Sequence, residues 1–258
     1  EIAATGIGRE KTCFALCQEI MKGELKVAGK GDDIARMEQA IRSGLALFTE
    51  GVVSAPIEGV SKIEVKKNFD GSNYLAVYFS GPIRGAGGTG QAFTIILADI
   101  CRKLGGIGNY RATESEVERY IEEINLYARK TRAGQYVPTG DEIRSIVLNC
   151  PVCIAGEPTE DYEVTKTKNL PTVDTNRVRS GVCLVVSEGL CLKAAKVLKI
   201  AKKAGLAWDW IESLIKVTKK EGGSKPEMKP NDKYMEEIVA GRPIFSYPMT
   251  AGGFRLRY

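Results

Sequence analysis

The chain has 258 residues, of which 43% are hydrophobic and 27% are charged, and this composition is typical of a soluble globular protein. Its net charge is +5, and it contains no histidine. The lack of imidazole excludes Ser-His-Asp triads, Cys-His pairs, HExxH zinc sites and facial-triad iron sites. No run of about 18 apolar residues predicts a membrane span, and no signal peptide is recognisable. We therefore expect a cytoplasmic protein with no membrane partner.

The N-terminal third predicts two helices followed by a β-hairpin. Apolar side chains recur at helical spacing from Cys13 to Ile20 and again from Ile34 to Phe48. Two alternating runs then flank Asn68-Phe69-Asp70-Gly71-Ser72, in which Asp-Gly is a turn signal. The second run, Tyr74 to Phe79, leads directly into the most glycine-rich stretch of the chain.

This glycine-rich stretch, Ser80 to Gln91, joins the predicted strand to a predicted helix over Ala92 to Leu104. Glycines permit tight turns and close approach to the backbone, and free N–H groups at a helix start suit an anion such as phosphate. Arg84 is the only cation in the stretch. The spacing is neither that of a Walker A loop nor that of a dinucleotide site. The alternative is a tight turn whose glycines serve packing. The glycines in question are Gly81, Gly85, Gly87, Gly88 and Gly90.

Capping-box patterns that begin at Thr113 and Thr139 predict two further helices. The first of these helices carries Glu118, Glu122 and Glu123. Carboxylates on the outer face of a capped helix are usually solvated, so we expect these three to face solvent rather than to form a metal or acid–base site.

Seven cysteines raise the question of a metal site or of disulfides. Cys150-Pro151-Val152-Cys153 is a CxxC, but a structural zinc site needs four ligands and the chain has no second CxxC. The other five lie in apolar helical patterns. We therefore predict that the cysteines pack in the core and that the chain holds no metal.

The second half predicts a short hairpin and a long helical region. Cys150 to Ile154 and Tyr162 to Val164 flank a Gly-Glu-Pro turn signal and favour a second hairpin. Helical spacing then runs from Asp174 to Ala201, with Gly181 and Gly189 as positions that could break or kink it.

Basic residues gather at two places in this half. Asn176, Arg177 and Arg179 lie near the predicted helix start, where guanidinium groups and backbone N–H groups suit phosphate. The alternative is that these arginines pair with the acidic segment Glu157 to Glu163. Lysines recur every three or four residues from Lys193 to Lys203, which fits either a basic surface or the solvated face of an amphipathic helix.

The domain organisation is predicted from these elements. Residues 1–220 form an α+β domain, mostly helical with short antiparallel hairpins. Residues 221–231 are rich in glycine and proline and form a linker. Residues 232–258 begin the following segment, which is extended and basic. Its arginines alternate with aromatic and aliphatic residues and suit a nucleic-acid surface, and they include Arg242, Arg255 and Arg257.

Five sequence blocks carry a resemblance to a known family. The blocks are Thr49-Glu50-Gly51-Val52-Val53 with Ala55-Pro56, Gly81-Pro82-Ile83-Arg84 with Ala86-Gly87-Gly88-Thr89 and Gln91-Ala92, Asn149-Cys150-Pro151-Val152 with Gly156-Glu157-Pro158-Thr159-Glu160, Asn176-Arg177-Val178-Arg179, and Ala240-Gly241-Arg242-Pro243-Ile244-Phe245-Ser246 with Gly252-Gly253-Phe254-Arg255-Leu256-Arg257-Tyr258. In this order they resemble the large subunit of the archaeal family D DNA polymerase, also called DNA polymerase II. They span nearly the whole chain.

The resemblance implies the N-terminal portion of the polymerising subunit of a two-subunit replicative DNA-directed DNA polymerase. In that family catalysis lies in a two-barrel core, and the metal-binding aspartates belong to a later Asp-rich motif that has no counterpart in this chain. We therefore expect a piece of a longer polypeptide that is inactive alone and has no catalytic residue, metal or cofactor of its own, whereas the full enzyme uses Mg²⁺. The implied partners are the small subunit and primer–template DNA, and self-association is left open.

The working hypothesis is a module for subunit assembly and DNA binding, with a set of residues facing nucleic acid. One alternative is a pure assembly or dimerisation module with no DNA contact. Another is an independent nucleotide-binding protein that uses the Gly81–Gly90 loop. The residues predicted to face nucleic acid are Arg84, Gln91, Asn176, Arg177, Arg179, Arg242, Arg255 and Arg257.

Overall fold

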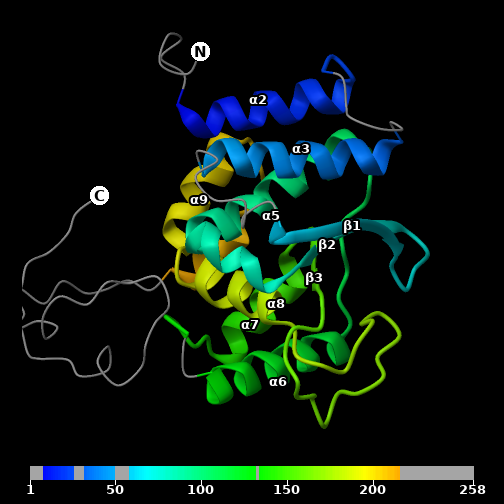
Figure 1. The fold of residues 1–258 in the computed structure, drawn as a ribbon, viewed down its shortest axis with the longest axis vertical. Coiled ribbons are helices and arrows are strands. Elements are labelled where there is room, and N and C mark those ends of the chain that lie inside the picture. The colour runs from blue at the N-terminus through cyan, green and yellow to red at the C-terminus, as the bar shows by residue number, and fades with distance from the viewer. Residues whose placement is uncertain (1–7, 26–31, 50–57, 132–133, 216–258) are drawn as a thin grey trace, which may run out of the picture. The chain divides into compact units, whose positions relative to one another are not determined.

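The computed structural model describes residues 8–25, 32–49, 58–131 and 134–215. Its first two helices, α2 (Arg9–Lys22) and α3 (Asp33–Phe48), confirm the prediction from apolar spacing. The side chain of Asp32 accepts a hydrogen bond from the Ala35 N–H at 2.6 Å and so fixes the start of α3. The two helices lie side by side and pack against α5 (Figure 1).

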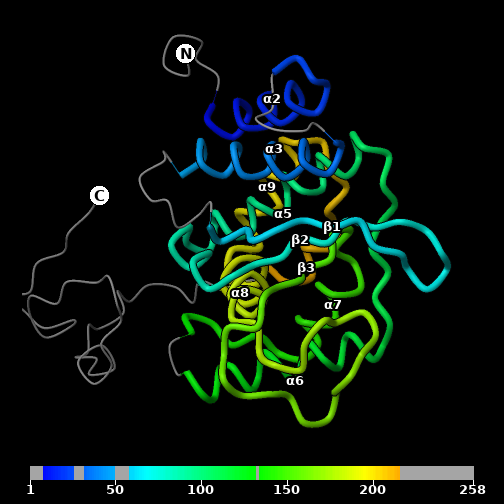
Figure 2. The backbone as a smooth tube through the Cα atoms, turned by 45° about the vertical axis from the view of Figure 1, so that its right-hand side comes forward, coloured from blue at the N-terminus to red at the C-terminus, as the bar shows by residue number. Residues whose placement is uncertain are grey.

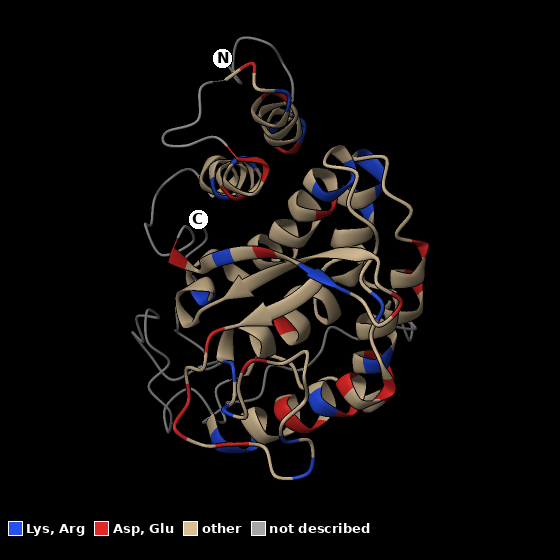
Figure 3. Ribbon diagram, turned by 90° about the vertical axis from the view of Figure 1, so that its right-hand side faces the viewer, with Lys and Arg blue, Asp and Glu red and all other residues tan. Residues whose placement is uncertain are grey.

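A three-stranded sheet follows. β1 (Val60–Lys67) and β2 (Asn73–Phe79) are antiparallel and confirm the predicted hairpin, whose turn places Gly71 in the left-handed region at φ 84°. β3 (Cys153–Gly156) pairs with β2 in parallel, and the strand order is β1-β2-β3. All charged residues of the sheet lie on the edge strand β1, while β2 and β3 are free of charge (Figure 3).

The second predicted hairpin is wrong. Tyr162 to Val164 does not return along β3, and Glu163 instead forms an isolated bridge with Arg177. The turn signal after β3 marks the end of the strand correctly. The local pattern cannot show that β3 is an apolar strand whose partner, β2, lies much earlier in the chain.

The central element of the core is α5 (Gly87–Leu104), which lies among the other helices and the sheet (Figures 1 and 2). Every residue of α5 from 90 to 102 is buried. β2 is buried on both faces. Leu75, Val77 and Phe79 join the main core, while the alternate residues join a smaller cluster on the opposite face. That smaller cluster contains Tyr74, Ala76, Tyr78, Tyr110, Cys153 and Ala155.

Both capping boxes are confirmed. α6 (Glu114–Thr131) follows Thr113, whose N–H donates to Glu116 Oε2 at 2.7 Å while its Oγ1 accepts from the Glu116 N–H at 3.3 Å. α7 (Gly140–Asn149) begins with the same reciprocal pair of bonds at Thr139. Each box therefore satisfies otherwise unpaired donors at the helix start.

The predicted long helix is shorter and is interrupted. It begins at Ser180 rather than at Asp174, and α8 (Ser180–Leu184) runs into the π-helix η2 (Val185–Cys191) before α9 (Ala194–Lys203). A Cβ built on Gly189 would lie 3.2 Å from the Ala92 nitrogen, so the π-helical turn packs closely against α5. Residues 157–179 form a long loop before α8 (Figure 2).

The fold is α+β and mainly helical, as predicted, with one hairpin instead of two. A final 3₁₀ helix, η3 (Asp209–Leu214), closes the described chain. No described helix has the length and apolar character needed to cross a membrane. The predicted linker and the segment after it lie outside the described residues.

Candidate nucleic-acid interface

The glycine turn connects β2 to α5, as the sequence predicts. The N–H of Ser80 donates to the Gly59 carbonyl at 3.0 Å, and its hydroxyl donates to the Glu58 carbonyl at 2.7 Å. A 3₁₀ helix, η1 (Gly81–Ala86), follows, and Gly87 at φ 65° makes the transition into α5. Only glycine adopts that conformation without strain.

Two of the five glycines serve close packing. A Cβ on Gly88 would collide with the carbonyl oxygen of Glu188 in η2, and a Cβ on Gly90 would lie 3.0 Å from the Ala86 Cβ. Gly81 and Gly87 have more room, and Gly85 is exposed. The start of α5 is thus covered by η2. These contacts favour the packing interpretation at Gly88 and Gly90 over a phosphate cradle.

Gln91 is a core residue rather than a surface contact. Its side chain is fully buried, and its Nε2 lies 3.5 Å from the Ile83 carbonyl oxygen. Its Oε1 has no hydrogen-bond partner among the described residues. The prediction that Gln91 faces nucleic acid fails because α5 is buried from Gly90 onward.

Arg84 is exposed and makes no ion pair with any described residue. Burial raises the pKa of the Tyr127 hydroxyl in α6 to about 12, and the positive charge of Arg84 works against that rise. The carboxylates of Glu160 and Glu188 also act on this hydroxyl. Glu188 is only 5% exposed and accepts the Gln135 N–H at 3.1 Å. Of these charged residues around the Tyr127 hydroxyl, Arg84 is the exposed cation.

The lysines of α9 lie opposite its buried face, which includes Val197 and Ala201. Lys202 and Lys203 are engaged in ion pairs with Glu212 and Glu10, at 3.0 and 2.8 Å. The other three lysines of this region pair with no described residue. They are Lys193, Lys196 and Lys199.

The first of these three lysines adjoins the glycine turn. A Cβ on Gly88 would lie 3.3 Å from Lys193 Cγ, which places the first lysine at the start of α5. Lys196 and Lys199 follow at intervals of three residues along α9 and are exposed. We call Arg84, Lys193, Lys196 and Lys199 the glycine-turn surface. The lysine spacing was visible in the sequence, but it did not show which lysines are paired.

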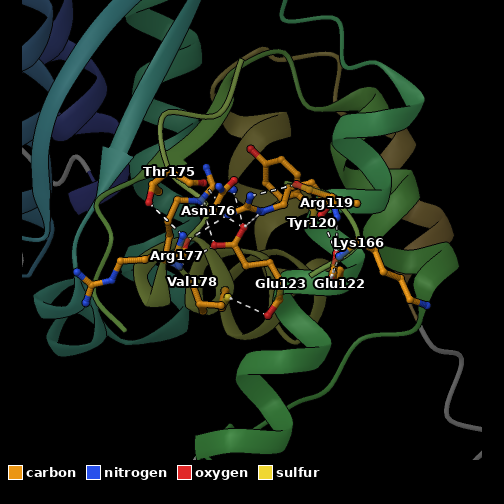
Figure 4. A network of polar contacts seen from close by, with 12 residues as sticks. Arg119, Tyr120, Glu122, Glu123, Lys166, Thr175, Asn176, Arg177 and Val178 are labelled. Carbon is orange, nitrogen blue, oxygen red and sulfur yellow. Dashed lines mark hydrogen bonds and ion pairs between the residues drawn. The ribbon is translucent and has the colours of Figure 1, made fainter. Parts of the chain in front are cut away.

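Arg179, by contrast, is buried and belongs to a network of charges with Glu123 and Arg119, both of which are labelled in Figure 4. Its guanidinium donates to Glu123 at 2.7 Å from Nη2, and its backbone N–H donates to the same carboxylate at 2.6 Å. Arg119 donates to Glu123 from Nε at 3.1 Å and to the carbonyls of Thr175 and Arg177 from Nη2. Glu123 is fully buried, so the prediction that it faces solvent is wrong.

Asn176 and Arg177 are held within the 157–179 loop. Arg177 donates to Asp161 at 2.7 Å and to the Glu160 carbonyl at 2.7 Å, which confirms the alternative that it pairs with the acidic segment. The side chains of Asn176 and Asn169 are hydrogen-bonded at 2.9 Å. The predicted phosphate cluster at 176–179 is therefore occupied by contacts within the chain.

Glu122, the residue before Glu123 on α6, fixes the same 157–179 loop. It accepts the backbone N–H groups of Thr165, Lys166 and Thr167, together with both threonine hydroxyls. Partial burial acts to raise the pKa of Glu122, but the hydrogen bonds outweigh it and lower the pKa to about 2. Of the three glutamates expected to face solvent, only Glu118 makes an exposed pair, with Arg144.

The cysteines confirm the core-packing prediction, because all seven are free and buried. Within the described ranges, no three residues of the metal-ligating types His, Cys, Asp and Glu gather closely enough to hold an ion. The predicted contacts Arg242, Arg255 and Arg257 lie outside the described residues.

Comparison with known proteins supplies the observation that decides the family. Residues 1–217 match the family model described as DNA polymerase II large subunit DP2, N-terminal. The chain belongs to the DNA polymerase II large subunit family. Residues 220–258 match the model of the DP2 central domain.

Individual relatives agree with this membership. The chain is 48% identical over 258 residues to the DNA polymerase II large subunit of Methanosarcina barkeri and 47% identical over 261 residues to that of Archaeoglobus fulgidus. These alignments cover 98% and 100% of the chain but only 22% of each relative. The homologue from Methanoculleus marisnigri is 51% identical over 229 residues, which is 86% of the chain and 17% of the relative. The chain thus spans about a fifth of a DNA polymerase II large subunit.

Proposed function

We propose that the chain is the N-terminal, non-catalytic part of the large subunit of a DNA-directed DNA polymerase, and that it helps to hold primer–template DNA. Family membership and the names of the relatives support the polymerase assignment. In this proposal the catalytic aspartates and their Mg²⁺ lie in the remainder of the large subunit, and a small subunit completes the enzyme.

The observation that carries the DNA role is the glycine-turn surface. Its four cations make no ion pair with a described residue, whereas Lys202, Lys203, Arg177 and Arg179 all do. Unpaired cations are free to replace the counterions of a phosphate backbone, and the release of those ions drives binding. The paired cations would first have to give up their carboxylates.

The test is the salt dependence of DNA binding. Fluorescence anisotropy of a labelled primer–template with the full chain gives the slope of log Kd against log salt concentration. Lys196→Gln/Lys199→Gln removes two unpaired cations, and Lys202→Gln/Lys203→Gln removes two paired cations from the same helix as a matched control. We expect the first double variant to lower the slope by about two and the control to change it less, because each phosphate contact contributes about 0.9 to the slope.

Two outcomes would overturn the DNA role. One is a wild-type slope in Lys196→Gln/Lys199→Gln, and the other is no binding by the wild-type chain at low salt. In the second case, sedimentation with the small subunit would test the assembly role alone. The close packing at Gly88 and Gly90 gives no support to an independent nucleotide-binding protein.

A further inference from the structure

The turn of the β1–β2 hairpin presents an aromatic side chain to solvent. Phe69 is 75% exposed, and the other large hydrophobic residues that are exposed in the described chain range from 40% to 57%. The hairpin extends outward beyond the neighbouring helices in both views (Figures 1 and 2). A phenylalanine in this place contributes little to the core. Only a partner outside the described chain could bury its ring.

The turn holds this side chain on a rigid support. The Gly71 N–H donates to the Asn68 carbonyl at 3.0 Å, and the Asn68 N–H donates to the Ser72 carbonyl at 2.8 Å. The carboxylate of Asp70 accepts from the Ser72 N–H at 3.0 Å. These bonds involve every residue of the turn except Phe69, so the turn does not depend on the aromatic ring.

The turn is also fixed to the segment that follows α5. The Asn68 side chain, which is 6% exposed, donates to the Asn109 carbonyl at 2.8 Å and accepts the Arg111 N–H at 2.9 Å. Arg111 Nη1 lies 2.6 Å from Asp70 Oδ2. Phe69 is therefore pre-organised, and little conformational entropy is lost when a partner covers it.

The charges at the hairpin end favour an anionic partner. Lys67 is exposed and pairs with no described residue, and the side chain of Arg111 is 61% exposed. Asp70, the one acidic residue of the turn, is occupied by Arg111 and by Ser72. An exposed aromatic face with cations beside it is the combination that binds single-stranded nucleic acid, by stacking on a base and neutralising the adjacent phosphates.

We propose that Phe69 stacks on an unpaired base of single-stranded DNA while Lys67, which is unpaired among the described residues, contacts a flanking phosphate. This inference rests on the proposed function in taking DNA as the ligand. It concerns a different element from the glycine-turn surface, and the contribution of Phe69 is of a different kind, because stacking on the ring does not release counterions.

The test compares a labelled oligothymidine with a blunt duplex of the same length, using the full chain. Phe69→Ala is expected to raise the Kd for the single strand about 5- to 150-fold, since stacking contributes about 1–3 kcal/mol per base. The Kd for the blunt duplex and the salt slope should stay close to the wild-type values. Phe69→Tyr should retain the affinity, and Val137→Ala, at another exposed apolar site, serves as the matched control.

A second readout reports on the site directly. The two native tryptophans are Trp208, which is buried, and Trp210, which is partly buried. Phe69→Trp adds an exposed indole, and oligothymidine should quench its fluorescence, measured against the wild-type signal, if a base stacks there. Wild-type affinity of Phe69→Ala for the single strand, or no quenching in Phe69→Trp, would overturn the inference. So would a loss on Phe69→Ala that affects only association with the small subunit, which would indicate a protein partner. Failure of the proposed function would appear separately, as an unchanged salt slope in Lys196→Gln/Lys199→Gln.

Discussion

Glu123 supplies the negative charge between two buried guanidinium groups, those of Arg119 and Arg179. The site holds two positive charges and one negative charge, and backbone carbonyls such as that of Thr175 satisfy the remaining donors of Arg119. Glu123→Gln would leave both guanidinium groups buried without a counter-charge. We expect it to lower the free energy of unfolding by about 3–5 kcal/mol, the usual cost of breaking a buried ion pair.

Urea unfolding followed by circular dichroism would measure this change. Glu118→Gln is the matched control, because Glu118 lies on the same helix and its pair with Arg144 is exposed. The control should change the free energy of unfolding by less than about 1 kcal/mol. Equal effects of the two substitutions would show that the buried network contributes no more than a surface pair.

The three glutamates also show what residue-level reasoning can and cannot predict. Helical position placed Glu118, Glu122 and Glu123 alike on an outer face. What separates them is the 157–179 loop, which brings backbone N–H groups to Glu122 and the Arg179 guanidinium to Glu123. These partners come from a segment without regular periodicity, so no pattern in the sequence indicates them.

At the scale of elements, the contact between α5 and η2 depends on Gly88. A Cβ there would meet the Glu188 carbonyl oxygen, which is backbone and cannot turn aside as a flexible side chain would. Gly88→Ala should therefore destabilise the protein by about 1–3 kcal/mol, the usual cost of overpacking a core. In the same turn, a Cβ on Gly81 would come no closer than 3.6 Å to Ser180 Oγ, so Gly81→Ala is a matched control.

Thermal unfolding of the two variants would check this prediction. We expect a clear fall in Tm for Gly88→Ala and little change for Gly81→Ala. If Gly88→Ala were as stable as the wild type, the packing explanation of this glycine would be wrong.

The elements differ in how far the sequence predicts them, because their contacts differ in range. α2, α3 and the β1–β2 hairpin follow from local periodicity and a turn signal, and all three are present in the structure. The pairing of β3 with β2 and the π-helical turn η2 depend on contacts with elements distant in sequence. Local spacing favours a hairpin after Cys150 and a continuous helix after Asp174. In the structure, tertiary packing pairs β3 with β2 instead and interrupts the helix at η2.

For the whole molecule, the sequence blocks predicted the family and the mixture of helix and strand patterns predicted the fold class, whereas most described residues predicted to contact nucleic acid are buried or paired. Arg84 is exposed, as a nucleic-acid contact requires, but Gln91 and Arg179 are core residues and Arg177 is paired. A basic residue next to a motif can equally be part of the core. Only the positions of the acidic side chains around a basic residue in the structure show whether its charge is available to a partner.

The seven buried cysteines report on the stability of the whole described unit. Burial raises the pKa of the Cys13 and Cys150 thiols to about 12 and that of Cys153 to about 11. The thiolate is the reactive form, so the native protein should react slowly with Ellman's reagent at mildly alkaline pH, and all seven thiols should react rapidly in guanidinium chloride. A thiol that reacts rapidly in the native protein would contradict the core-packing assignment.

The time course of that reaction tests cooperativity. The thiols lie on α2, α5, β3, α8 and η2 and just after α7, so they sample most of the core. If these elements open together, all seven thiols should react in a single phase, at a rate set by unfolding of the unit. A separate early phase of two thiols, abolished by Cys13→Ala/Cys17→Ala, would show instead that α2 opens before the rest. We expect the single phase, because α2 packs against both α3 and the largely buried α5, and Cys17 donates a hydrogen bond to the Ala40 carbonyl.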